Sequence, residues 1–169
     1  MVVLVTMVKY VDTLVTLSEF PNEITLCINI SGCPNHCYHC HSQYLWEDIG
    51  TILNKESLFN LIEQNQGITC VGFLGGDQAP NTINWLAKCV KETYPNLKVG
   101  WYSGKQELSK DIDLDYFDYY KLGPYIEEKG PLSNPNTNQV FYSKGKHLHK
   151  LDVSEESWYD VTYWFWHSL

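Results

Sequence analysis

The chain has 169 residues, the length of one domain and too short for a complete eight-unit barrel of roughly 250 residues. Apolar residues make up 44% of it, which suffices for an ordinary core and excludes global disorder. The formal net charge is −8, and every basic residue is a lysine. Because a nucleic-acid backbone is bound by clustered cations, with arginine favoured, we expect no nucleic-acid partner.

The expected elements alternate between strands and helices, and turn residues separate them. Asn54 is the expected N-cap of the first helix, and Pro95 ends the second. In chain order we predict a strand at 24–31, a helix from Asn54, a strand at 68–74, a helix from about Pro80 to Tyr94, a strand at 97–102, a short helical piece at 106–110, a strand at 116–122 and a strand at 139–143.

This alternation predicts an α/β fold whose parallel sheet is built with crossover helices. The loops that leave the carboxyl ends of parallel strands meet at one edge of the sheet, where ligands bind. Four loops, which follow Ser31, Leu74, Tyr102 and Leu122, are therefore expected to converge on one site. The segment 157–166 is so aromatic that helix and strand, and interface and core, all remain open for it.

The apolar stretch Met1–Met7 is too short for a signal peptide. Residues 24–46 lack Asp, Glu and Lys, but they include Gly32, Pro34 and four cysteines, so we expect no membrane helix there. Six cysteines in a chain without a secretory signal favour reduced thiols. We expect a cytoplasmic protein with a single domain over residues 1–169.

The feature with the clearest chemistry is a loop with three cysteines, Cys33, Cys37 and Cys40. A [4Fe–4S] cluster ordinarily takes four thiolates, so three leave one iron open to a reactant. The alternative is a structural zinc site in an interaction module, with His36, His39 or His41 as the fourth ligand. The other cysteines, Cys27, Cys70 and Cys89, fall within expected strands or a helix and are assigned to the core.

The cysteine spacing resembles the signature of the radical S-adenosylmethionine superfamily, and Gly75-Gly76-Asp77 resembles its Gly-Gly-Glu motif, with Asp in place of Glu. The resemblance covers about residues 16–143 and implies a truncated, incomplete (βα) barrel. It implies that Cys33, Cys37 and Cys40 hold a [4Fe–4S] cluster whose fourth iron is chelated by S-adenosylmethionine. The residues implied to contact these cofactors are His39, Cys40, His41, Gly75, Gly76, Asp77 and Ser103.

Cys40-His41-Ser42 followed by Trp46 is similar to the glycyl-radical-enzyme activases of that superfamily. The segment from Lys121 to Glu128 resembles the activases of the anaerobic ribonucleoside-triphosphate reductase, as does Tyr102-Ser103-Gly104. The resemblance implies reductive cleavage of S-adenosylmethionine and hydrogen abstraction from a glycine of the reductase catalytic subunit. The electron would come from a low-potential donor such as flavodoxin or ferredoxin. A formate-lyase-type activase or a deazaguanine synthase is the nearest alternative.

Four aspartates precede and enter the strand expected at 116–122. They are separated mainly by apolar residues, which predicts a solvated turn and strand edge and not a metal site. These residues are Asp111, Asp113, Asp115 and Asp118.

Overall fold

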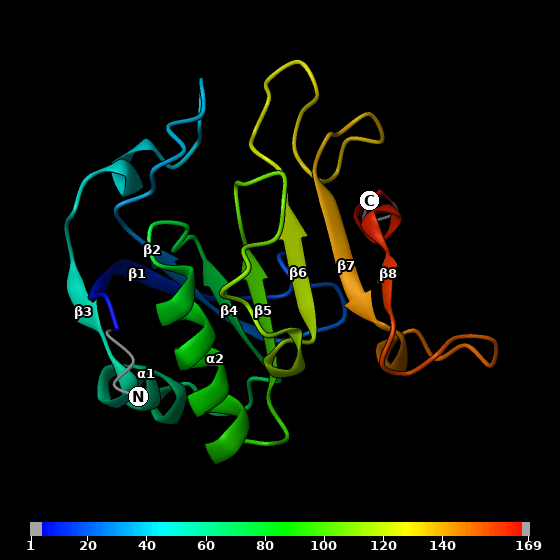
Figure 1. Ribbon diagram of the computed structural model, residues 1–169, viewed down its shortest axis with the longest axis horizontal. Helices are drawn as coiled ribbons and strands as arrows, with labels where there is room; N and C mark the ends of the chain where they lie inside the picture. The colour runs from blue at the N-terminus through cyan, green and yellow to red at the C-terminus, as the bar shows by residue number, and fades with distance from the viewer. Residues whose placement is uncertain (1–4, 167–169) are drawn as a thin grey trace.

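The computed structural model describes residues 5–166, so most of the apolar N-terminal stretch lies outside the described residues. The chain forms one eight-stranded sheet in the order β3-β1-β2-β4-β5-β6-β7-β8 (Figure 1). The strands are β1 (Val8–Thr16), β2 (Thr25–Ile30), β3 (Thr51–Leu53), β4 (Cys70–Leu74), β5 (Lys98–Tyr102), β6 (Tyr119–Leu122), β7 (Val140–Lys144) and β8 (Trp158–Asp160); the α-helices are α1 (Lys55–Gln64) and α2 (Pro80–Thr93).

The predicted fold class is wrong. The sheet is mixed, because only β2, β4, β5 and β6 pair in parallel, while β1, β3, β7 and β8 pair antiparallel at the two sides. Strands dominate, and the described chain has two α-helices where a partial barrel of the radical S-adenosylmethionine type is rich in helices. The helical piece expected at 106–110 does not form, and the β5–β6 connection carries only the 3-10 turn η2 (Leu114–Tyr116). Hairpin pairing at both sides therefore replaces further crossover units.

Local signals predicted the first helix well. Asn54 caps α1, and its side chain accepts a hydrogen bond from the Ser57 amide at 2.9 Å, while the Ser57 hydroxyl accepts one from the Asn54 amide. This reciprocal cap satisfies two backbone donors that a helix start leaves free. The second helix, α2, begins at Pro80 and ends before Tyr94, as the positions of its prolines indicate.

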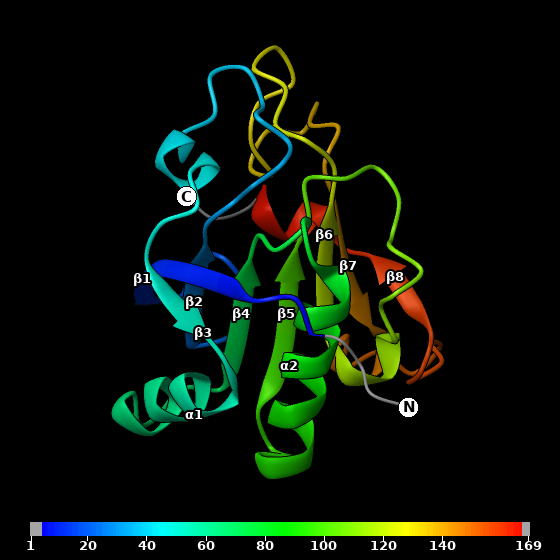
Figure 2. The same ribbon diagram turned by 60° about the vertical axis from the view of Figure 1, so that its left-hand side comes forward.

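One face of the sheet is covered by both α-helices (Figure 2). Side chains of β2, β4 and β5 alternate between the two faces of the sheet. Those that point to this face are apolar and buried. Leu58 of α1 and Leu86 of α2 are fully buried against this face. The carboxyl ends of β4, β5 and β6 point to the same edge, above which the cysteine loop and the segment from Gly123 to Asn138 rise.

The opposite face is only partly filled. The Phe20 ring, from the β1–β2 connection, lies over Gly72 and Gly100, where a Cβ atom would meet the ring at 2.5 and 2.0 Å. Phe20 also packs against Tyr119 and Phe141 with ring centroids 6.0 and 5.8 Å apart. These rings fill the middle of this face, and a cavity remains nearer the carboxyl ends of β2, β4 and β5.

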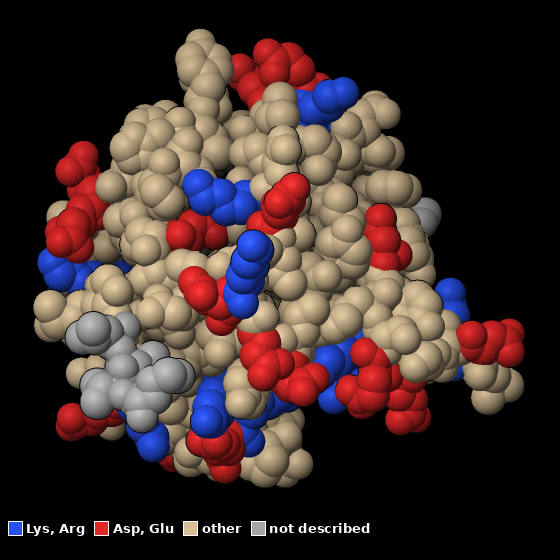
Figure 3. All heavy atoms as spheres, viewed as in Figure 1, with Lys and Arg blue, Asp and Glu red and all other residues tan. Residues whose placement is uncertain are grey.

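The aromatic tail forms both kinds of local structure, since β8 is followed by the 3-10 turn η4 (Thr162–Phe165). Trp164 and Phe165 pack against the partly filled face, whereas Tyr163 and Trp166 are more than a third exposed. No helix within residues 5–166 is long and apolar enough to cross a membrane. Lysines and acidic residues are interspersed over the face drawn in Figure 3.

Candidate metal centre

The three-cysteine loop follows β2 and leads into the 3-10 turn η1 (Gln43–Trp46). Its first residues are tied to the chain that leaves the loop: the Gly32 amide donates to the Glu47 carbonyl at 3.1 Å, and the Cys33 amide to the Leu45 carbonyl at 2.9 Å. Because both ends of the loop are held together, its middle is presented as a unit at the carboxyl edge of the sheet.

All three loop thiols line one cavity of about 600 Å³, on the partly filled face of the sheet near the carboxyl ends of β2, β4 and β5. The Cys33 sulfur accepts a hydrogen bond from Asn35 Nδ2 at 3.7 Å, and the Cys40 sulfur accepts one from the Ser42 amide at 3.4 Å. Within residues 5–166, no three His, Cys, Asp or Glu side chains are grouped to hold a single metal ion. In a cubane each thiolate binds its own iron, so thiols facing a shared cavity are a donor set that suits such a cluster.

Two histidines of the loop, His36 and His39, do not line this cavity. His36 and His39 have positive φ angles of 45° and 54°, a backbone region that a non-glycine residue seldom adopts. The His36 ring stacks on Trp46 with centroids 4.7 Å apart. His39 Nδ1 lies 2.8 Å from Glu127 Oε2, in the β6–β7 connection. His39, predicted to contact the cofactors, is exposed and does not line the cavity, and its cofactor contact stays a prediction.

The remaining predicted residues divide into two groups. Cys40, His41, Gly75 and Asp77 line the cavity, whereas Gly76 and Ser103 lie behind its wall. Their cofactor contacts stay predictions.

Contacts within the protein explain why residue 76 is a glycine, without any ligand. Its φ is +94°, and a Cβ atom there would lie 2.5 Å from Ile83 Cδ1 of α2. Helix packing and backbone conformation thus already require a glycine at this position.

The backbone of Gly75 is largely engaged within the protein. Its amide donates to the Tyr102 carbonyl at 3.1 Å, and its carbonyl accepts from Trp101 Nε1 at 2.8 Å. A carbonyl oxygen has a second lone pair, so Gly75 can still accept one hydrogen bond from a group in the cavity.

Two charged residues beside the cavity, Lys121 and Glu19, had no individual role predicted from the sequence. Burial lowers the pKa of Lys121 to about 8, although the negative charge of Asp77 and the three loop cysteines acts to raise it. Its ammonium donates to the Gly123 carbonyl at 3.1 Å and lies over the Tyr102 ring. Burial raises the pKa of Glu19, which lines the cavity, and the charge of Lys121 opposes that rise. No pattern identifies Glu19, because only the β1–β2 connection brings it there.

Cys27 also faces the cavity, from the middle of β2, but it differs from the loop cysteines. It is 1% exposed, and burial raises its pKa to about 12, followed by a smaller effect of the Glu19 charge. Burial likewise raises the pKa of Cys70 well above its ordinary value. Both residues lie inside sheet strands, Cys27 on β2 and Cys70 on β4, and outside the three-cysteine loop, so the loop itself presents three thiols.

A family model described as a 4Fe-4S single cluster domain matches residues 24–138. The matched segment runs from the start of β2 to the end of the β6–β7 connection and includes the whole three-cysteine loop. Comparisons with curated proteins and with solved structures find no significant match. By its family match over most of its length, the chain belongs to the 4Fe-4S single cluster domains.

Proposed function

We propose that the protein is a radical S-adenosylmethionine enzyme that activates a glycyl-radical partner, the anaerobic ribonucleoside-triphosphate reductase. The observation that carries the proposal is that the three thiols of one loop line a single cavity in a 4Fe-4S family member. Cys33, Cys37 and Cys40 would hold the cluster, and the remaining iron would be open to a substrate. When bound, such a cluster supplies the electron that cleaves the sulfonium of S-adenosylmethionine.

The cavity has the size and walls that such a substrate needs. Its volume of about 600 Å³ falls within the roughly 300–1,000 Å³ typical of small-molecule sites. Leu74, Tyr102 and Leu132 supply apolar surface, while Asn29 and Gln139 offer polar groups. Apolar walls exclude water and strengthen the electrostatic interactions inside. The protein would contribute orientation, dryness and charge, and the reactive chemistry would come from the cofactors.

The Lys121 ammonium is buried, and the negative charges of Asp77 and of the three loop cysteines act on it. This single cation offsets part of the negative charge that thiolates bring to the site. That balance supports the proposal, because a cluster with three thiolates is anionic and buried anions require nearby cations or donors.

The test is electron paramagnetic resonance on the full chain, reconstituted anaerobically with iron and sulfide and then reduced. We expect a [4Fe–4S] signal that changes on addition of S-adenosylmethionine, because the substrate would bind the open iron. A signal that the addition leaves unchanged contradicts the proposal. A colourless protein that contains zinc and lacks iron and sulfide supports the zinc-stabilised interaction module instead.

A second measurement separates the glycyl-radical activase from related enzymes. Incubation with S-adenosylmethionine, a reductant and the reductase catalytic subunit should produce a glycyl radical on the subunit. Turnover of a small molecule without a radical on the subunit would favour a deazaguanine synthase. A radical on formate lyase, and none on the reductase, would favour the other activase class.

A further inference from the structure

Asp77 directly follows the two glycines after β4. Its carboxylate accepts hydrogen bonds from other loops of the protein. Its Oδ1 accepts from the Ser103 hydroxyl at 2.5 Å. Its Oδ2 accepts from the Gly104 amide at 2.8 Å and from Asn35 Nδ2 at 2.6 Å. A carboxylate has about four acceptor sites, so these three donors leave little for a ligand.

Asn35 connects this carboxylate to the proposed cluster. It lies between Cys33 and Cys37, and the same Nδ2 that donates to Asp77 also donates to the Cys33 sulfur at 3.7 Å. An amide nitrogen has two hydrogens, so it can serve both acceptors at once. The contact needs close approach: a Cβ atom on Gly104 would lie 2.5 Å from Asn35 Nδ2.

Gln78, the residue after Asp77, binds the start of the same loop. Gln78 Nε2 donates to the Ser31 carbonyl at 2.6 Å, and a Cβ atom on Gly32 would lie 3.1 Å from this nitrogen. Two consecutive side chains, Asp77 and Gln78, therefore hold the start and the middle of the three-cysteine loop against the carboxyl ends of β4 and β5.

We propose that Asp77 and Asn35 are positioning residues: the carboxylate fixes the Asn35 amide, which orients the Cys33 thiolate and donates a hydrogen bond to it. The inference rests on the proposed ligation of the cluster by this loop. Groups that orient metal ligands in this way typically change metal affinity by about 10–100-fold when they are removed. A hydrogen bond to a cluster sulfur stabilises the reduced, more negative state and so raises the reduction potential.

The proposal assigns Asp77 a part that differs from substrate contact. Its carboxylate acts on the loop, and only the backbone of this turn is left for S-adenosylmethionine. The aspartate side chain is one methylene shorter than the glutamate of the motif that it resembles, which matches the short distances to Ser103 and Gly104.

The first experiment needs no cluster. Hydrogen exchange of the amides in residues 33–42 is compared between the metal-free wild-type chain, Asp77→Ala and a control, Asp113→Asn. Asp113 accepts a hydrogen bond from the Asp115 amide in η2, away from the cysteine loop. We expect faster exchange of the loop in Asp77→Ala and wild-type exchange in the control. Unchanged exchange in Asp77→Ala overturns the positioning role.

The second experiment measures the reconstituted full chain. Release of iron to a chelator should be about tenfold faster in Asp77→Ala than in wild type, by the usual effect of a lost orienting group. Asn35→Leu, which keeps the approximate size and removes the donor, should shift the cluster midpoint potential to a more negative value. A wild-type potential in Asn35→Leu overturns the proposed hydrogen bond to Cys33.

The two proposals fail in different ways. If wild type assembles no cluster, the proposed function fails, and the exchange experiment still decides whether Asp77 holds the loop. If Asp77→Ala keeps wild-type loop exchange and iron release but loses affinity for S-adenosylmethionine in a titration, then Asp77 is a substrate contact and the positioning role is wrong.

Discussion

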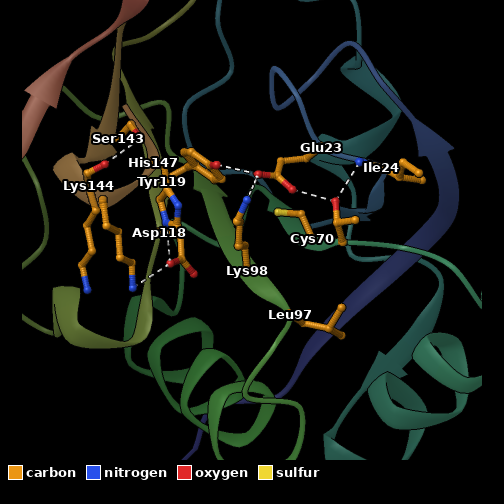
Figure 4. A network of polar contacts seen from close by, with 12 residues as sticks. Glu23, Ile24, Cys70, Leu97, Lys98, Asp118, Tyr119, Ser143, Lys144 and His147 are labelled. Atoms are coloured by element: carbon orange, nitrogen blue, oxygen red, sulfur yellow. Dashed lines mark hydrogen bonds and ion pairs between the residues drawn. The ribbon is translucent and has the colours of Figure 1, made fainter. Parts of the chain in front are cut away.

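At the amino ends of the central strands, buried carboxylates are paired inside the protein, whereas at the carboxyl ends the three loop thiols line a cavity. Glu23, which precedes β2, is 3% exposed. Its carboxylate forms an ion pair with Lys98 and accepts hydrogen bonds from the hydroxyls of Tyr119 and Thr69, each at 2.6 Å (Figure 4). The Glu23 carboxylate is therefore satisfied by partners within the protein.

Asp118, at the start of β6, follows the same rule. It is 1% exposed, and it accepts from Lys91 at 2.5 Å, from His147 at 2.9 Å and from the Val99 amide at 2.9 Å. The expectation that the aspartates before β6 are all solvated is therefore wrong for Asp118. The network in Figure 4 makes it a structural anchor between α2, β5 and the segment after β7.

The loop thiols at the opposite edge have one weak donor at Cys33 and one at Cys40, and all three border open space. Glu23 and Asp118 thus have their hydrogen-bonding capacity filled by protein partners, whereas the loop thiols retain capacity and border a cavity. Buried polar groups with full partners hold the elements together, and groups with spare capacity are available to a ligand.

The largest effect is expected from Cys37→Ala, which tests whether the loop thiols bind the cluster. We expect complete loss of [4Fe–4S] assembly, because two remaining thiolates cannot hold the cubane, with folding retained. Iron and sulfide content and the cluster absorption measure the effect. Cys89→Ala, on α2 and outside the cavity, is the matched control and should assemble the cluster as wild type does. An intact cluster in Cys37→Ala refutes the ligand assignment.

At the amino edge, Glu23→Gln should reduce the free energy of unfolding by about 3 kcal/mol, the lower end for a broken buried pair, because Lys98 stays partly exposed. Urea unfolding of the metal-free chain measures it. Glu63→Gln is the control, since Glu63 also accepts from a tyrosine hydroxyl, that of Tyr94, but on the exposed surface. An equal loss in both variants would remove the distinction between the two edges.

Acid should weaken the amino edge through Asp118. Burial alone would raise the pKa of Asp118, but the His147 hydrogen bond and the Lys91 charge hold it well below its usual range. The contribution to stability is therefore complete above the unfolded pKa of about 4 and is lost as pH falls below that value. Urea midpoints between about pH 3 and 6 should fall more steeply with acid in wild type than in Asp118→Asn. Parallel slopes would contradict the assignment.

The smallest effect is expected where an ion pair is exposed. Lys88 and Glu92 lie one turn apart on α2 with a 3.7 Å contact, and both side chains are more than a third exposed. Lys88→Ala should change the free energy of unfolding by about 0.3 kcal/mol or less, because solvent screens such pairs. A loss as large as that in Glu23→Gln would show that burial is not what separates these pairs.

Elements with local signals were predictable. The Asn54 cap, the prolines around α2 and the apolar runs of β2, β4 and β5 place these elements within a few residues of where they lie. The strand expected at 139–143 is also present, as β7. The long strand β1 was missed, although its segment is rich in the β-branched and aromatic residues that favour strands; its antiparallel pairing with β2 and β3 is what places it in the sheet.

The candidate site was likewise only partly predictable from the sequence. Spacing alone placed Cys33, Cys37 and Cys40 in one loop, and the structure adds that they share a cavity. Ser103, whose cofactor contact stays a prediction, donates a hydrogen bond to Asp77, which only the fold shows. Asn35 was not singled out, because its importance depends on a carboxylate that lies 42 residues away in the chain.

Local sequence patterns were enough to indicate soft thiol donors at close spacing, an acidic chain without arginine, and strands and helices with clear caps. How these parts combine depends on the fold, including the antiparallel strands at both sides, the Phe20 ring over Gly72 and Gly100, and the burial of Asp118. The physical reason is range. Caps, turns and ligand spacing are set by neighbours along the chain, whereas strand pairing and burial depend on contacts between segments that only folding brings together.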